Sequence, residues 1–97
     1  MKNFRLYQIA LLFFKKCRPV PMPRHLKDQL DRASASISCN ISEGYGRLAK
    51  LDKRRFYRIA LGSTRECRTL LILAEREDHE LMEMLDFLAG GLYKLSR

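Results

Sequence analysis

Apolar residues recur at steps of three and four along nearly the whole 97-residue chain, and this periodicity constrains the fold more than any other feature. Such spacing places apolar side chains on one face of an α-helix, because the helix turns once every 3.6 residues or so. No sustained alternation of apolar and polar residues marks a β-strand. The sequence therefore predicts an all-α fold.

The first helix is expected to run from an N-cap at Asn3 to about Cys17. The stretch Pro19–Pro23 then forbids its continuation, since proline lacks the backbone N–H that a helix interior needs. The expected buried face of this helix is made of Phe4, Tyr7, Leu11 and Phe14.

The second helix should begin near Arg24 and end at Gly44 or Gly46, because glycine tolerates the left-handed conformation that closes many helices. Its apolar residues step by four, three, four and four. The expected stripe is Leu26, Leu30, Ala33, Ile37 and Ile41.

Two further helices complete the pattern. Asp52 is the expected N-cap of the third, whose core face comprises Phe56, Ile59, Ala60, Ser63, Cys67, Leu70, Leu71 and Ala74. The fourth should start near Asp78 or His79 and bury Leu81, Leu85, Leu88, Leu92 and Leu95, and it is expected to bend or end at Gly90-Gly91. Short connections favour antiparallel neighbours, so residues 1–97 are predicted to form one domain, an antiparallel up-and-down four-helix bundle.

The formal net charge of +8 is unevenly distributed. Residues 1–20 carry +5, whereas residues 78–97 carry −2. A basic body suits an anion-binding protein, with nucleic acid as the commonest large anion in cells, although an ordinary solvated basic surface would look the same. No signal peptide or membrane span is expected, and three widely spaced cysteines, Cys17, Cys39 and Cys67, indicate reduced thiols in the cytoplasm.

One face of the third helix carries four arginines, Arg54, Arg58, Arg65 and Arg68, opposite its expected core stripe. Arginines in line can bind successive phosphates, because the planar guanidinium makes paired hydrogen bonds. They are equally consistent with an exposed face holding intrahelical pairs. Leu61 and Ile72 lie among them and suggest a partly buried surface, such as a subunit contact.

The outer face of the second helix is made of small residues where Lys and Glu are usual: Ala35, Ser38, Cys39 and Ser42. Small side chains let another helix approach closely, which favours packing against a neighbouring subunit. A tolerant exposed surface is the alternative.

The junction between the second and third helices gathers polar and basic residues. The predicted nucleic-acid-binding set is Arg47, Lys50, Lys53, Arg54, Arg55, Arg58, Arg65 and Arg68. Asn40, Glu43, Gly44 and Gly46 precede it, and a rigid corner joining two helices is the simpler interpretation of this part.

No catalytic constellation is evident. His25 and His79 lack the i, i+4 partner that metal ligation on a helix requires, so no metal and no cofactor is expected. Glu43 and Glu66 are better explained as partners of arginines at the helix junction than as an acid/base pair. We therefore expect a binding protein and no enzyme.

Two motifs are specific: Asn-Ile-x-Glu-Gly-x-Gly-Arg at 40–47 and Ala-x-Gly-Ser-x-x-Glu at 60–66. Over most of residues 4–75 the chain resembles the 23S rRNA intervening-sequence proteins, a family of four-helix bundles. It departs from them at Asp31, where Arg is usual, at Ser42, where Ala is usual, and after Glu75. The motif positions implied to shape the corner are Asn40, Glu43, Gly44, Gly46, Arg47, Gly62, Ser63 and Glu66.

This resemblance also implies a genomic context, an oligomeric state and binding partners, none of which the residues themselves indicate. Family members are encoded in insertions of ribosomal RNA genes or elsewhere in bacterial genomes. Related proteins, the accessory variability determinants of diversity-generating retroelements, form pentamers that bind nucleic acid and a reverse transcriptase. By resemblance, the oligomer interface would comprise Ala35, Ser38, Cys39, Ser42, Leu61 and Ile72.

The resulting hypothesis is a cytoplasmic, homo-oligomeric protein that binds the phosphate backbone of RNA or DNA without catalysis and without a membrane. The alternative is an adaptor that docks a reverse transcriptase or another protein partner on the same basic face. The sequence leaves RNA and DNA equally open.

Overall fold

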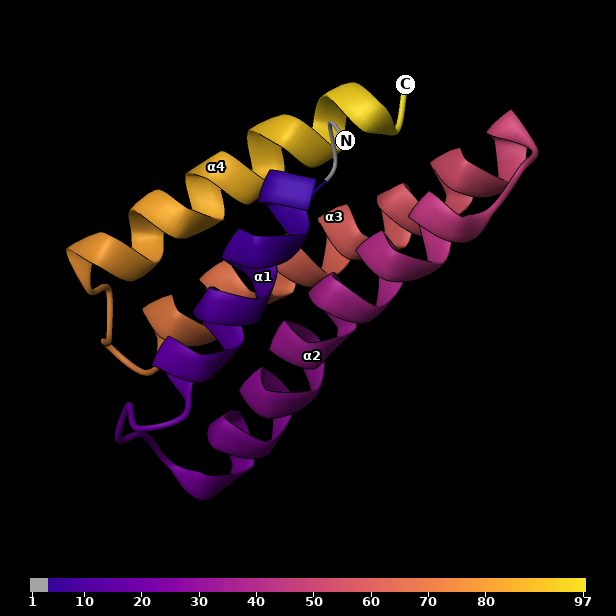
Figure 1. The fold of residues 1–97 in the computed structure, drawn as a ribbon. Coiled ribbons are helices and arrows are strands. Elements are labelled where there is room, and N and C mark those ends of the chain that lie inside the picture. Colours follow the sequence, from indigo (N-terminus) through magenta and orange to yellow (C-terminus); the bar gives the residue numbers. More distant parts are fainter. Residues whose placement is uncertain (1–3) are drawn as a thin grey trace.

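The computed structural model describes residues 4–97, which form four α-helices and no strand. They are α1 (Phe4–Cys17), α2 (Arg24–Gly46), α3 (Lys50–Leu73) and α4 (His79–Leu95), shown in Figure 1. Each helix packs against two others, α1 and α3 lying on α2, and the same two helices contacting α4. The all-α prediction is confirmed, and the contacts are compatible with the expected antiparallel up-and-down arrangement. The predicted Asn3 cap lies outside the described residues.

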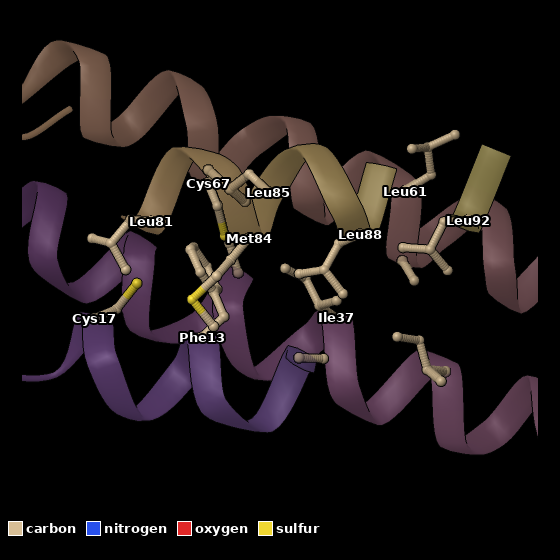
Figure 2. Close-up of a cluster of buried hydrophobic side chains, with 14 of the residues drawn as sticks. Phe13, Cys17, Ile37, Leu61, Cys67, Leu81, Met84, Leu85, Leu88 and Leu92 are labelled. Atoms are coloured by element: carbon tan, nitrogen blue, oxygen red, sulfur yellow. The ribbon is translucent and has the colours of Figure 1, made fainter. Parts of the chain in front are cut away.

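Two of the predicted stripes form the centre of the core. Leu30, Ala33, Ile37 and Ile41 of α2 are at most 1% exposed, and Leu26 is half-buried. Leu81, Leu85, Leu88 and Leu92 of α4 are buried, with Leu95 half-buried. Figure 2 shows the α4 leucines together with Phe13 and Ile37 from the other helices. Regular spacing on helices with a polar far side was enough to place these faces.

The predicted core face of α1 is wrong. Its buried residues are Leu6, Ala10, Phe13 and Cys17. Phe4 and Leu11 are 46% and 37% exposed, while Tyr7 and Phe14 are half-buried. Residues 9–14 are apolar all around the helix, so periodicity alone did not distinguish the side that meets α2 and α4.

The predicted face of α3 is correct in part. Ala60, Ser63, Cys67, Leu70 and Leu71 are buried, and Ala74 and Phe56 are half-buried, but Ile59 is 42% exposed. Leu61, expected on a spare outer face, is instead only 7% exposed and belongs to the core. Tyr57 and Thr64, one turn on either side of Leu61, are also buried, so the buried face of α3 is wider than the predicted stripe.

The helix ends also differ from expectation. α2 ends at Gly46 as predicted, yet none of the glycines in residues 4–97 has a positive φ, and the closing residue Arg47 is extended at φ −80°. α3 begins at Lys50 after Ala49, which makes no side-chain cap, and Asp52 lies in the first turn. Asp78 is the N-cap of α4, its carboxylate accepting from the Leu81 backbone N–H at 3.1 Å.

α4 continues through Gly90 and Gly91, where a bend or an end was expected. A Cβ on Gly91 would lie 2.7 Å from Cδ2 of Leu6, so the bare backbone gives α1 room to approach α4. At the other end of α1, Lys27 donates from Nζ to the carbonyls of Cys17 (2.5 Å) and Arg18 (2.7 Å). These bonds satisfy acceptors that the end of a helix leaves open. Within residues 4–97, no helix has the length and apolar character needed to cross a membrane.

Candidate nucleic-acid interface

The corner between α2 and α3 is held together by its own basic residues. Lys53 donates from Nζ to the carbonyls of Gly44 at 3.3 Å and Tyr45 at 3.0 Å, which places a positive charge at the negative end of the α2 dipole. Arg47 forms an ion pair with Glu43 at 3.0 Å, one turn earlier on α2. These two members of the predicted phosphate-binding set therefore also organise the corner.

An aromatic ring contacts Arg47 and one further cationic group, Arg55. The guanidinium carbons of Arg47 and Arg55 lie 4.8 Å and 4.7 Å from the centroid of the Phe56 ring. At these distances the cations are attracted to the electron-rich face of the ring. Half-buried Phe56 thus contributes to the site by orienting arginines, rather than as the core residue that its spacing predicted.

The C-terminal part of α4 reaches the same corner, and the two segments enclose an open pocket of about 480 Å³. In Figure 1 the end of α4 lies toward the end of the bundle where α2 and α3 are connected. Five cations line the pocket, and none of its lining residues is acidic. The lining comprises Lys50, Lys53, Arg54, Lys94 and Arg97 together with Tyr45, Tyr57 and Leu95.

Sequence reasoning missed Lys94 and Arg97, because residues 78–97 are acidic in sum. All four acidic residues of this segment lie between Asp78 and Asp86, in its first half. The separation of charge along α4 was the signal available in the sequence. It places the acidic half away from the pocket and the basic half in it.

The arginine face of α3 does not lie opposite the core as predicted. Arg58 donates from Nε to the carbonyl of Ser96 at 3.1 Å, and Arg68 forms an ion pair with Asp86 and contacts the sulfur of Met82 at 3.6 Å. Both arginines therefore face α4. Arg54 is half-buried in the pocket, whereas Arg65 is exposed.

A comparison with known protein families matches the model described as 23S rRNA-intervening sequence protein over residues 3–93. The chain belongs to this family. No curated protein and no solved structure matches the chain. The family match spans the whole α2–α3 corner but stops before Lys94, so two of the five cations of the pocket lie beyond it.

In this member of the 23S rRNA-intervening sequence family, the motif residues form a polar seam between α2 and α3. The hydroxyls of Ser36 and Ser63 lie 2.8 Å apart, and Asn40 donates from Nδ2 to the Ser36 carbonyl at 2.8 Å. Glu66 pairs with Arg32 rather than meeting Glu43. The two glutamates are thus arginine partners, as expected. Gly62 is exposed, and a Cβ there would meet nothing within 4 Å.

The small face of α2 forms one wall of a second open groove, of about 350 Å³. Ser38, Cys39 and Ser42 line it from α2, and Tyr7 and Leu11 line it from α1. Ser38 is itself buried and Ala35 half-buried, so these two residues do not lie on the outer face of α2 where the sequence placed them. Among the expected interface residues only Cys39, Ser42 and Ile72 are exposed, the last at 45%.

No three His, Cys, Asp or Glu side chains within residues 4–97 are placed to hold a metal ion together. Two thiols are buried in the core, and this burial raises the pKa of Cys17 to about 12 and raises that of Cys67 as well. Lys27 near Cys17 opposes the effect only in part. Both groups are neutral thiols at physiological pH and are poor nucleophiles.

Proposed function

We propose that this protein is a homo-oligomeric, non-catalytic nucleic-acid-binding bundle that holds the phosphate backbone of RNA or DNA. The observation that carries the proposal is the corner of α2 and α3, where cations of α3 meet cations of the C-terminal end of the chain, on and just after α4, around a pocket with no acidic lining. Such a concentration of positive charge attracts polyanions and releases their counterions on binding. The family description, which refers to 23S rRNA, favours RNA as the ligand.

The basic residues divide into two groups with different roles. Lys50, Arg54, Arg55 and Arg65 make no ion pair or hydrogen bond with another side chain of the described chain, so their charges are available to phosphates. Arg47, Lys53, Arg58 and Arg68 are held by carbonyls or carboxylates. These four residues hold positive charge at fixed positions, and this charge adds to the attraction that the first group exerts on phosphates. Phosphate contacts of this kind position a protein without reading sequence.

Self-association is supported by apolar surface on α1. Phe4, Leu11 and Leu12 are 46%, 37% and 43% exposed, and the helical turn places Phe4 and Leu11 on the same side. Leu11 also borders the groove lined by the small residues of α2. A patch of this type beside a shallow groove is typical of subunit contacts. A second copy packed there would cover both features.

Light scattering of the purified, nuclease-treated protein tests the assembly, and fluorescence anisotropy with labelled RNA or DNA across a salt series tests binding. Affinity should fall steeply with salt, and Lys50→Ala and Arg54→Ala should each lower the slope of log affinity against log salt by about 0.7–0.9. Arg24→Ala is the matched control, because it removes one exposed charge at the far end of α2, about 30 Å away along the helix. A monomer with no salt-dependent binding would refute the proposal.

The alternative is a protein-interaction adaptor. It is favoured by Leu48 and Leu51, which are 99% and 74% exposed among the cations of the corner. Exposed leucines do not help to bind phosphate, whereas a protein partner such as a reverse transcriptase would bury them. If Leu48→Ser/Leu51→Ser abolishes capture of a reverse transcriptase encoded beside this chain and leaves binding of nucleic acid intact, the adaptor is the better description.

A further inference from the structure

The pocket between α4 and the α2–α3 corner contains aromatic rings as well as cations. Tyr57 is 3% exposed and belongs to the core, whereas Tyr45 is 46% exposed at the same pocket. Phosphate binding alone gives no reason for a large aromatic side chain to remain exposed among lysines and arginines. The aromatic ring is therefore the feature that the proposed function leaves unexplained.

The ring of Tyr45 is held by its neighbours. Nζ of Lys53 lies 5.7 Å from the ring centroid and is itself fixed by hydrogen bonds to the carbonyls of Gly44 and Tyr45. A cation at this distance is attracted to the electron-rich face of the ring and restricts its motion. Tyr45 is thus a partly immobilised platform, which lowers the entropy lost when a ligand packs on it.

The size and shape of the site select the ligand. A volume of about 480 Å³ falls within the range of small-molecule sites and has room for one nucleotide, but not for a duplex. In a duplex the bases are paired and stacked on one another, so no base is free to enter the pocket. An unpaired base, in contrast, can turn out of the strand and stack on an aromatic side chain.

We propose that this pocket binds one unpaired nucleotide of a single-stranded nucleic acid. The base stacks on Tyr45, and the adjoining phosphates bind Lys50, Arg54 and Lys94. This inference rests on the proposed function and deepens it, because it predicts a preference for single strands over duplexes. Base and phosphate are common to RNA and DNA, so either strand satisfies the pocket.

Fluorescence anisotropy tests this with three labelled probes measured at one salt concentration: oligo(U), oligo(dT) and a duplex DNA. Tyr45→Ala should weaken binding of both single strands by about five- to a hundredfold and leave duplex binding unchanged, while Tyr45→Phe should retain the wild-type affinity. Phe87→Ala is the matched control. Phe87 is also 46% exposed and has a cation, Arg5, 5.9 Å from its ring centroid, but it lies outside the pocket.

Lys94→Ala provides a second variant that leaves the tyrosine intact. It should lower the salt slope for single strands by about 0.7 and not affect the duplex. Suppose that the wild-type protein binds nucleic acid with the expected salt dependence and that Tyr45→Ala binds the single strands with the same affinity as the wild type. The inference is then overturned and the proposed function stands. If the wild-type protein binds none of the three probes, both this inference and the proposed function are wrong. A larger loss on oligo(U) than on oligo(dT) supports the inference and identifies RNA as the ligand.

Discussion

Gly44 of α2 lies directly against Tyr57 of α3: a Cβ on Gly44 would be 2.7 Å from Cε1 of the tyrosine ring. Gly44 is buried within a helix and has no positive φ, so its role is to provide space and not an unusual backbone conformation. The missing side chain lets the two helices approach closely at the corner where the basic pocket forms. The glycine of the family motif thus has a packing explanation in this structure.

Gly44→Ala should therefore destabilise the protein. The added methyl group must displace a buried aromatic ring, at a cost of about 1–3 kcal/mol, against a gain in helix propensity of about 1 kcal/mol. We expect a net loss of up to about 2 kcal/mol in the free energy of unfolding, measured by urea denaturation. Gly46→Ala is the control, because a Cβ there meets nothing within 4 Å. Equal effects of the two substitutions would contradict the packing explanation.

The end of α3 stores strain at one residue. Glu75 has φ 58° and follows the last turn, with hydrogen bonds from its own N–H to the Ile72 carbonyl (3.0 Å) and from the Arg76 N–H to the Leu71 carbonyl (2.8 Å). This is the Schellman arrangement, in which glycine is the usual left-handed residue. A residue with a Cβ is disfavoured there by about 1–2 kcal/mol.

Replacing that residue with glycine should relieve the strain. Glu75→Gly is expected to raise the free energy of unfolding by about 0.5–1 kcal/mol, since part of the gain is offset by the greater entropy of glycine in the unfolded chain. Glu77→Gly is the control. Glu77 is another exposed residue of the same loop and has no positive φ, so its substitution should bring no gain. Loss of stability in both variants would show that the left-handed residue is not strained.

Periodicity predicted the fold wherever a helix has one apolar side. The stripes of α2 and α4 were correct for this reason, and α4 begins at His79 after the cap Asp78, which agrees with the start expected near these two residues. The face of α1 was wrong because the helix is apolar all around. The prediction that Leu61 lies on an outer face was wrong because the buried face of α3 is wider than the predicted stripe and also includes Tyr57 and Thr64, one turn on either side of Leu61.

The candidate site was less predictable because it depends on tertiary contacts. Arg58 and Arg68 follow a helical spacing that sequence can detect, but only the fold shows that they contact α4. Lys94 reaches the corner from α4. The sequence did not indicate this because the net charge of residues 78–97 is negative. Glycine is the residue that usually marks a left-handed conformation at a helix end, and the end of α3 has none. The sequence therefore did not predict the left-handed turn at Glu75.

The three cysteines should differ sharply in reactivity. Cys39 is exposed, whereas Cys17 and Cys67 are completely buried. Since the thiolate is the reactive form and burial disfavours it, a thiol reagent at pH 8 should modify one group per chain rapidly and the other two only on unfolding. Cys39→Ser should remove the fast phase. Rapid modification of two or three groups in the native protein would contradict the buried placement.

The same thiols should make the protein less stable at high pH. Burial raises the pKa of Cys17 from its ordinary value of 9.0 to about 12, and it raises that of Cys67 in the same direction. The folded state therefore holds these protons more tightly than the unfolded state, so their contribution to stability is complete below pH 9 and is lost as pH rises toward 12. Urea midpoints should fall across this interval. The fall should be smaller in Cys17→Ala/Cys67→Ala, and an identical pH profile in that variant would assign the effect to other groups.

The ion pair between Arg68 and Asp86 joins α3 to α4 and withholds one arginine from phosphate. Its carboxylate is largely exposed, with a side-chain exposure of 72%, so Asp86→Asn should lower the free energy of unfolding by only about 0–1 kcal/mol. The freed guanidinium should nevertheless strengthen binding of nucleic acid and steepen its salt slope by up to about 0.9. Asp28→Asn gives the same change in net charge at the start of α2, where its partner Arg24 lies far from the pocket. If both variants raise affinity equally, net charge governs binding and the arginines of α3 have no special part in it; if only Asp86→Asn does, the α3–α4 surface is part of the contact.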